Sequence, residues 1–178
     1  FDLTMVRKNL EDIPDHTLPR GYHFRFFLEG DEHTWAEIEA AVGEFETKAQ
    51  ALKHFQDEFG NDIEEMKKRC IFIVDKDGKP FGTVTAWRGD IRGKLEGRIH
   101  WVAIIPEYQG QGFAKPLITK AMNVLDKYHT SAYLTTQTTS HQAVNLYLDF
   151  GFEPYTEKKA DKKGWELMEE VLERKILD

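Results

Sequence analysis

The chain has 178 residues, 40% of them hydrophobic and 31% charged, and its formal net charge is −7 at pH 7. This length suits one compact domain, and the acidic balance is unlike the basic face of a nucleic-acid binder. No apolar run approaches the roughly 20 residues that span a bilayer, so we expect no membrane partner. The single cysteine excludes an intramolecular disulfide and fits a reducing cytoplasm.

The first half of the chain predicts a strand, then helices, then a hairpin. Two stretches keep apolar residues at the spacing of an amphipathic helix, and a polar turn with one glycine separates two apolar runs. The segment 89–97, rich in glycine and charge, is predicted to be a surface connection. In chain order the predicted elements are a strand at 22–28, helices at 35–42, 45–59 and 63–69, and strands at 70–75 and 81–88.

Strands and helices alternate in the second half. Thr139 to Gln142 has the S/T-x-x-Q form of a capping box, and Gly151 is a natural C′ residue for the helix that follows. The whole predicts an α/β (α+β) fold, a mixed sheet with antiparallel N-terminal strands and helices on both faces, as one domain over 1–178. The predicted elements are strands at 98–105, 133–136 and 152–156, helices at 113–128 and 141–150, and a C-terminal helix within 160–178.

Cys70 opens the apolar run that forms the predicted strand at 70–75. We therefore predict a buried strand residue. A catalytic thiol is the alternative interpretation.

A glycine-rich turn follows the predicted strand at 98–105 and leads into the next helix. The first N–H groups of a helix lack intrahelical acceptors and lie at the positive end of its dipole. An anionic phosphate can bind there when no side chain blocks it, and Gly110 and Gly112 leave the approach open. Lys115 and Pro116 do not supply the Gly-Lys-Ser/Thr of a P-loop, and Lys115 replaces the third glycine of a dinucleotide fingerprint. A turn that binds no ligand is the alternative.

Two segments carry a resemblance to a known family. Residues 102–114 resemble motif A of the GCN5-related N-acetyltransferase (GNAT) superfamily, whose core Q/R-x-x-G-x-G/A is matched by Gln109, Gly112 and Ala114. Residues 143–152 resemble motif B of the same superfamily, and the clear match covers 70–152. The resemblance implies a single acyl-coenzyme A-dependent N-acetyltransferase domain.

The resemblance also implies where the cofactor binds. Acetyl-coenzyme A would be the acyl donor, and no metal would be needed. Its pantetheine arm would add like a strand beside Val102, Ala103 and Ile104. The pyrophosphate would bind the backbone N–H groups of the turn, which comprises Gln109, Gly110, Gln111, Gly112, Phe113 and Ala114.

Two side chains are implied in the proton transfers. A tyrosine at the position of Tyr147 commonly protonates the departing thiolate in this family; a core aromatic residue is the alternative. The family's strand glutamate corresponds to Arg98, which cannot accept a proton. His100 resembles the histidine of arylalkylamine N-acetyltransferases, and an ordinary pKa of about 6.5 suits a base. Strand alternation predicts that His100 and Trp101 point to opposite faces. A structural histidine and a water relay are the alternatives.

The acceptor is expected to be a small amine, attacked directly in a ternary complex. A protein or peptide acceptor and a non-catalytic coenzyme A-binding module are the other hypotheses. Aromatic residues of the N-terminal helices could wall the acceptor site or pack in the core. The family's final hairpin is absent, since the C-terminal residues predict a helix, and a monomer or a homodimer is expected. The aromatic residues concerned are Trp35, Phe45, Phe55 and Phe59.

Overall fold

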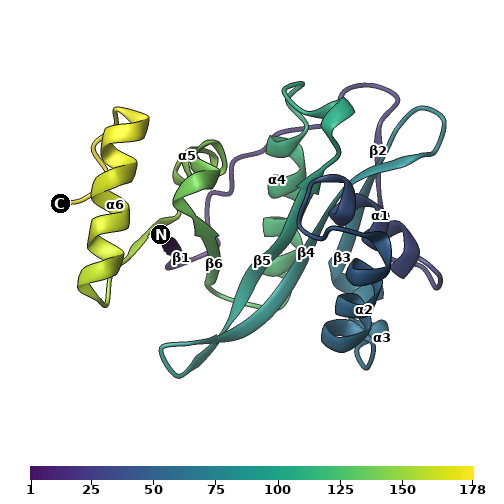
Figure 1. Cartoon of the computed structure of the whole chain (residues 1–178), viewed down its shortest axis with the longest axis horizontal. Helices are drawn as coiled ribbons and strands as arrows, with labels where there is room; N and C mark the ends of the chain where they lie inside the picture. Colours follow the sequence, from purple (N-terminus) through teal and green to yellow (C-terminus); the bar gives the residue numbers. More distant parts are fainter. The chain divides into compact units, whose positions relative to one another are not determined.

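The computed structural model describes residues 1–178 and contains one seven-stranded sheet, in the order β2-β3-β4-β5-β6-β1-β7 (Figure 1). None of the helices combines the length with the apolar composition that a membrane span requires. Short 3-10 turns occur at Pro106–Tyr108 and Thr138–Ser140. The elements are β1 (Asp2–Arg7), β2 (His23–Phe26), α1 (Glu32–Ala41), α2 (Lys48–Phe59), α3 (Ile63–Arg69), β3 (Cys70–Val74), β4 (Pro80–Ile91), β5 (Lys94–Ile104), α4 (Ala114–Asp126), β6 (Ala132–Gln137), α5 (His141–Asp149), β7 (Glu153–Tyr155) and α6 (Lys159–Leu172).

Contacts divide the chain into two compact units. Unit 1 contains residues 1–14, 88–98 and 125–178, and unit 2 contains residues 15–87 and 99–124. Strands β4 and β5 contribute residues to both.

The sheet is mixed, as predicted. Strand β3 is antiparallel to β2 and to β4, which confirms the antiparallel N-terminal strands. Strand β5 is parallel to β6, in register at Gly97↔Ala132 and Arg98↔Tyr133. A parallel pair needs a crossover connection, and α4 lies in that connection.

The predicted strand at 22–28 is present as β2, but it is not the first strand, because β1 precedes it. Strand β1 lies between β6 and β7 and is antiparallel to both. Its buried side chains include Leu3 and Met5, which alternate with more exposed ones as a half-buried strand requires. Helix α6 packs against it: a Cβ at Gly164 would lie 2.8 Å from Leu3 Cδ2. Strand β7 therefore pairs with the start of the chain, and the C-terminal segment is helical as predicted.

Two local predictions in unit 1 were also wrong. Residues 89–97 are mostly strand, because β4 and β5 continue into a tight hairpin. Its turn residues Arg92 and Gly93 have φ of 56° and 71°, the positive values that a type I′ hairpin turn requires. The capping box is not formed, since Thr139, its predicted capping residue, lies in a 3-10 turn, and Ser140 precedes α5 without a side-chain cap. Gly151 does end α5, with φ of 88°.

Helices α2 and α4 cover opposite faces of the sheet in unit 2. Phe27, just after β2, stacks on Phe55 of α2 at 5.6 Å between ring centroids. Its neighbour Phe26 lies under the ammonium of Lys120 of α4, at 5.4 Å. Because successive residues of a strand point to opposite faces, the two helices lie on either side of β2.

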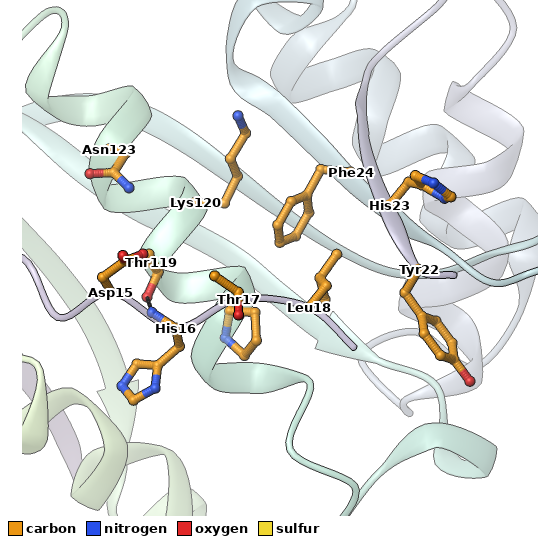
Figure 2. Close-up of a pocket in the computed structure, with 11 residues that line it drawn as sticks. Asp15, His16, Thr17, Leu18, Tyr22, His23, Phe24, Thr119, Lys120 and Asn123 are labelled. Atoms are coloured by element: carbon orange, nitrogen blue, oxygen red, sulfur yellow. Dashed lines mark hydrogen bonds between the residues drawn. The ribbon is translucent and has the colours of Figure 1, made fainter. Parts of the chain in front are cut away.

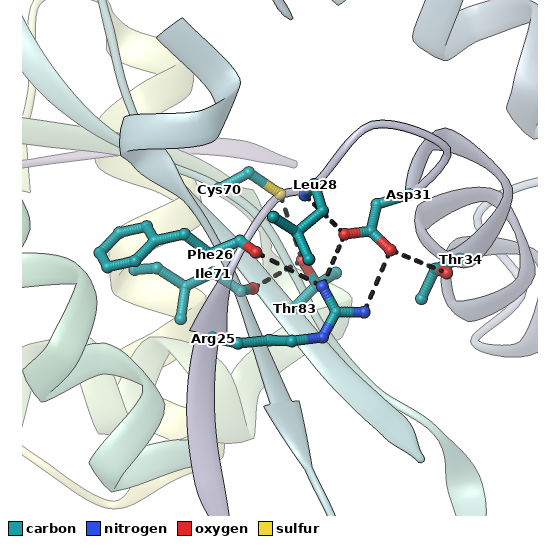
Figure 3. Close-up of polar contacts among 8 residues, drawn as sticks. All are labelled: Arg25, Phe26, Leu28, Asp31, Thr34, Cys70, Ile71 and Thr83. Atoms are coloured by element: carbon teal, nitrogen blue, oxygen red, sulfur yellow. Dashed lines mark hydrogen bonds and ion pairs between the residues drawn. The ribbon is translucent and has the colours of Figure 1, made fainter. Parts of the chain in front are cut away.

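An ion pair anchors the start of α1 to β2 (Figure 3). Arg25 donates to both carboxylate oxygens of Asp31, at 2.6 and 3.0 Å, and the Leu28 N–H donates to the same group at 2.7 Å. Burial raises the pKa of Asp31, but the hydrogen bonds from Arg25 and Leu28 lower it below its ordinary value. Such bidentate pairs are strong and geometrically specific, so they hold α1 at a defined angle to the strand.

Cys70 is fully buried at the start of β3, as predicted. Its sulfur lies 3.7 Å from the Thr83 hydroxyl (Figure 3). Burial raises the pKa of the thiol to about 12. A thiol that stays protonated is a poor nucleophile, so the structure favours the buried strand residue over the catalytic thiol.

Candidate active site

The glycine-rich turn forms a cradle of backbone N–H groups before α4. Gly110 and Gly112 have φ of 73° and 85°, and no atom lies within 4 Å of a Cβ built at either position. None of the N–H groups of residues 110–114 donates a hydrogen bond to another protein group. Unpaired N–H groups at a helix N-terminus favour an anion. The turn therefore has the geometry of a phosphate site.

Aromatic packing fixes this turn to the sheet in unit 2. Tyr108 stacks on Phe81 at 3.9 Å between centroids, and its hydroxyl donates to Asp75 at 2.8 Å. Phe113 is 3% exposed and contacts both Phe81 and Tyr22 at 4.9 Å between centroids. Of the predicted phosphate-binding residues, Phe113 thus holds the turn in place with its side chain, and only its backbone N–H can face a ligand.

The two glutamines of the turn stabilise its backbone. The amide of Gln109 donates to the Ile104 carbonyl at 2.8 Å, and the amide of Gln111 donates to the Glu107 carbonyl at 2.9 Å. Both residues are exposed. These bonds hold the loop shape that leaves the N–H groups pointing outward.

Val102, Ala103 and Ile104 lie at the end of β5 that leads into the turn. The Ile105 N–H donates to the Phe81 carbonyl of β4 at 2.9 Å, so one edge of this segment is paired. The register of β5 with β6 ends at Arg98. Residues 102–104 therefore have no strand partner on their other edge, where an extended ligand could pair by its own hydrogen bonds.

The carboxylate of Glu58, on α2, contacts three side chains, one of which is His100. Glu58 Oε2 lies 2.6 Å from His100 Nε2, and its Oε1 lies 2.9 Å from Trp101 Nε1 and 2.8 Å from His54 Nε2. Burial raises the pKa of Glu58, but the hydrogen bonds from His100, Trp101 and His54 outweigh it and lower the pKa to about 2. The group is therefore ionised at neutral pH and can only accept hydrogen bonds.

His100 and Trp101 do not point to opposite faces, contrary to the alternation predicted for a regular strand. Both side chains reach Glu58. The reason is the backbone of Trp101, whose φ of 52° lies in the left-handed region. A bulky residue in that region is strained by about 1–3 kcal/mol, a cost often found at functional sites. This local break places two consecutive β5 side chains on the α2 side.

The aromatic residues of the N-terminal helices divide between core and site surroundings. Trp35, Phe55 and Phe59 are 0% exposed, which confirms core packing for these three. Phe45 is partly exposed and lies 5.6 Å from the Trp101 ring and 5.3 Å from the His54 ring, between centroids. Phe45 thus belongs to the rim of the cluster around Glu58.

Tyr147, the predicted acid, belongs to unit 1 and not to unit 2 with His100 and the turn. It lies on α5, is 6% exposed, and contacts Phe152 at 6.2 Å between centroids. Burial raises the pKa of its hydroxyl above the ordinary value. The hydroxyl is therefore protonated at neutral pH, the form that a general acid requires.

Unit 2 also contains an open cavity of about 460 Å³ between α4, β2 and the segment before β2 (Figure 2). Phe24 and Lys120 line it, and it lies on the α4 side of the sheet, whereas Glu58 lies on the α2 side. The Thr119 hydroxyl in its wall accepts a hydrogen bond from the His16 N–H at 3.2 Å. The cavity includes none of the predicted site residues.

Sequence reasoning missed Glu58 and the role of Trp101. A signal for Glu58 was present, since His54 and Glu58 are four residues apart and share a helix face. Its pairing with His100, 42 positions away, has no local signal. No group of three or more His, Cys, Asp or Glu in the chain could hold a metal ion.

Comparisons with known proteins identify a family for this chain. The model of the acetyltransferase (GNAT) family matches residues 31–152, which include the turn, His100 and Tyr147. The S-alkylcysteine N-acetyltransferase of Bacillus subtilis (strain 168) is 27% identical over 116 residues, which cover 61% of this chain and 65% of that enzyme.

Solved structures share the fold. A GCN5-related N-acetyltransferase from Sphaerobacter thermophilus superposes with a TM-score of 0.66 at 21% identity, over 86% of this chain and 48% of that one. A chain of the NatC complex bound to Gag peptide and CoA gives 0.55 at 20% identity, over 72% and 82%. The chain thus spans about half of the Sphaerobacter protein and just under two thirds of the Bacillus enzyme.

Proposed function

Because the chain belongs to the acetyltransferase (GNAT) family, we propose that it transfers the acetyl group of acetyl-coenzyme A to the primary amine of a small molecule. The observation that carries this proposal is the cradle of N–H groups at residues 110–114, which no protein acceptor fills. It opens next to the unpaired edge of β5.

The two features suit the two parts of the donor. The pyrophosphate is anionic and would bind the N–H groups of the cradle, where the helix dipole adds to the attraction. The pantetheine arm carries amide groups and would pair with the backbone at Val102, Ala103 and Ile104. A backbone N–H of that segment would then stabilise the oxyanion that develops on the thioester carbonyl.

Two side chains, those of His100 and Tyr147, would carry the proton transfers. His100 accepts a proton from the acceptor ammonium, and the freed amine attacks the thioester carbon. As the N–C bond forms, the C–S bond breaks and Tyr147 donates its hydroxyl proton to the departing sulfur. The nitrogen then loses its second proton to water, and a proton from water restores the Tyr147 hydroxyl. Burial raises the pKa of Tyr147, so the hydroxyl keeps its proton until a strongly basic group such as the departing thiolate is present.

A small amine with an amino-acid framework is the acceptor class we favour. The Bacillus relative is named for action on S-alkylcysteine. A protein or peptide amine is the second candidate, since the NatC structure of the same fold holds a peptide. The two classes are separated by comparing free amino acids with short peptides at equal amine concentration.

The test is release of coenzyme A thiol from acetyl-coenzyme A with a panel of S-alkylcysteines, other small amines and peptides. We expect the highest turnover with a small amine. Tyr147→Phe should lower kcat by about 100-fold or more while leaving acetyl-coenzyme A binding unchanged, since general acid catalysis contributes about that much.

Tyr155→Phe is the matched control. It removes the same hydroxyl from a partly exposed tyrosine of unit 1 that hydrogen-bonds Glu157, and it should leave kcat unchanged. Binding of acetyl-coenzyme A without thiol release for any amine would contradict the proposed activity and favour a non-catalytic coenzyme A-binding module.

A further inference from the structure

Glu58 links a partly buried histidine to a more exposed one. Its carboxylate contacts His100, whose side chain is 11% exposed, and His54, whose side chain is 37% exposed. The Trp101 indole N–H donates to the same oxygen that His54 contacts. Three polar contacts on one carboxylate fix the position of both of its oxygens, so Glu58 can orient the rings around it.

The identity of the contacting atoms determines the tautomer of His100. An ionised carboxylate accepts and cannot donate, so the nitrogen 2.6 Å from Glu58 Oε2 must carry a hydrogen. That nitrogen is Nε2. In neutral His100 the lone pair is therefore on Nδ1, and Nδ1 is the basic nitrogen.

We propose that Glu58 is a positioning residue for His100: it holds the Nε2–H tautomer, so that Nδ1 takes the proton of the acceptor ammonium, and it stabilises the resulting imidazolium. This inference rests on the proposed acetyl transfer. The step is balanced, since the proton leaves the ammonium nitrogen for Nδ1 and the amine keeps the electron pair with which it attacks. Glu58 remains an anion throughout.

The groups in contact with the pair come from α1, α2, the connection between them and β5. The ionisable side chains in contact with Glu58 are His100 of β5 and His54 of α2. Uncharged rings also contact the two histidines, namely Trp35 of α1, Phe45 of the α1–α2 connection, Phe59 of α2 and Trp101 of β5. A nearby opposite charge favours the protonated imidazole.

Glu58→Gln tests the proposal because it keeps the shape and removes the charge. We expect the pKa of His100, measured by NMR titration, to fall by about 1–3 units. The acid limb of the kcat/KM profile should move to lower pH by the same amount. Its plateau should fall by about tenfold because a weaker base transfers protons less efficiently. The KM for acetyl-coenzyme A should not change.

Asp57→Asn is the matched control. It removes one carboxylate from the same helix, at an exposed residue that pairs with Lys53, and should leave the His100 pKa and the pH profile as in the wild type. Glu58→Asp keeps the charge on a shorter side chain, so it should lower the pKa of His100 less than Glu58→Gln does. If Glu58→Gln does not fold, the nitrogen chemical shifts of wild-type His100 still test the proposal, since they report directly which ring nitrogen carries the hydrogen.

An Nδ1–H tautomer in the wild type, or an unchanged His100 pKa in folded Glu58→Gln, would overturn the role of Glu58. The NMR measurements need no substrate. Wild-type protein that releases no coenzyme A with any amine would overturn the proposed function, and the proton transfer with it. An active wild type with an unshifted His100 overturns the inference about Glu58 alone.

Discussion

Glu39 of α1 is a carboxylic acid in the core of unit 2. It is 0% exposed, and neither oxygen has a hydrogen-bond partner. Burial, with a smaller contribution from Glu44, raises its pKa well above the ordinary value. An ionised carboxylate without a partner is costly in such a place, so the residue is held in its protonated form.

Glu39 should therefore make stability depend on pH. Its pKa is higher in the folded than in the unfolded state, so its contribution is fully present below the unfolded pKa and is lost as pH rises toward the folded one. In that range the free energy of unfolding falls by up to about 1.4 kcal/mol per pH unit. We expect Glu39→Gln to remove this slope in urea denaturation between pH 5 and pH 8.

Glu37→Gln serves as the control for this prediction. It changes an exposed glutamate of the same helix that pairs with Lys48, and its pH slope should match the wild type. Equal slopes for wild type and Glu39→Gln would show that the carboxyl group titrates normally.

Individual residues were predictable where their signal is local. Gln109, Gly112 and Tyr147 are each marked by neighbours in sequence, and so the cofactor turn and the candidate acid could be proposed before the structure was known. Glu58 could not, because its partner His100 lies 42 positions away. The left-handed backbone of Trp101 is a conformation that favours glycine. A tryptophan at this position therefore predicted a regular strand.

At the scale of elements, the turn before α4 requires a positive φ at Gly112, and this requirement can be tested. Gly112 has room for a side chain, but its φ of 85° is strained for any residue with a Cβ. Gly112→Ala should cost about 1–2 kcal/mol in the native turn or move the N–H groups out of position. We expect affinity for coenzyme A, measured by calorimetry, to fall by about tenfold or more.

Gly93→Ala separates backbone strain from ligand binding. Gly93 also has a positive φ, of 71°, and open space around it, but it lies in the β4–β5 hairpin turn. The variant should lose similar stability while binding coenzyme A normally. Normal binding by Gly112→Ala would mean that the cradle does not hold the pyrophosphate.

Elements with their own periodicity were predicted well, and connections were not. Helices α1 and α2 and the β3–β4 hairpin follow from apolar spacing and a polar turn. The β4–β5 hairpin was missed because its end is charged and exposed around Arg92, a composition also typical of loops. The prediction of a capping box at Thr139 to Gln142 was wrong, since a matching sequence does not ensure that the side chain turns back to the helix.

Across the whole molecule, β1 is the element that sequence reasoning missed. It has six residues, and both of its partner strands come from the last third of the chain. Leu3 is 1% exposed, so its packing should matter to the stability of unit 1. We expect Leu3→Ala to lower the free energy of unfolding by about 2–4 kcal/mol, the usual range for a buried leucine, in urea denaturation.

Leu95→Ala is the matched control for this prediction. Leu95 belongs to the same unit but is 58% exposed, so its loss should change stability by no more than about 0.5 kcal/mol. Equal effects of the two substitutions would mean that β1 contributes little to the fold.

Strand β1 also imposes an order of events during synthesis. Its residues leave the ribosome before those of both partner strands, and Asp2 pairs with Gln137 and Arg7 with Ala132, about 130 positions later. Since domains form as the chain is made, Leu3, Met5 and Val6 must wait while the rest of the sheet is translated. Pairing of β1 with β6 can be completed only after residue 137 has been made, and pairing with β7 only after residue 155. Until then the edges of β1 stay open to other chains.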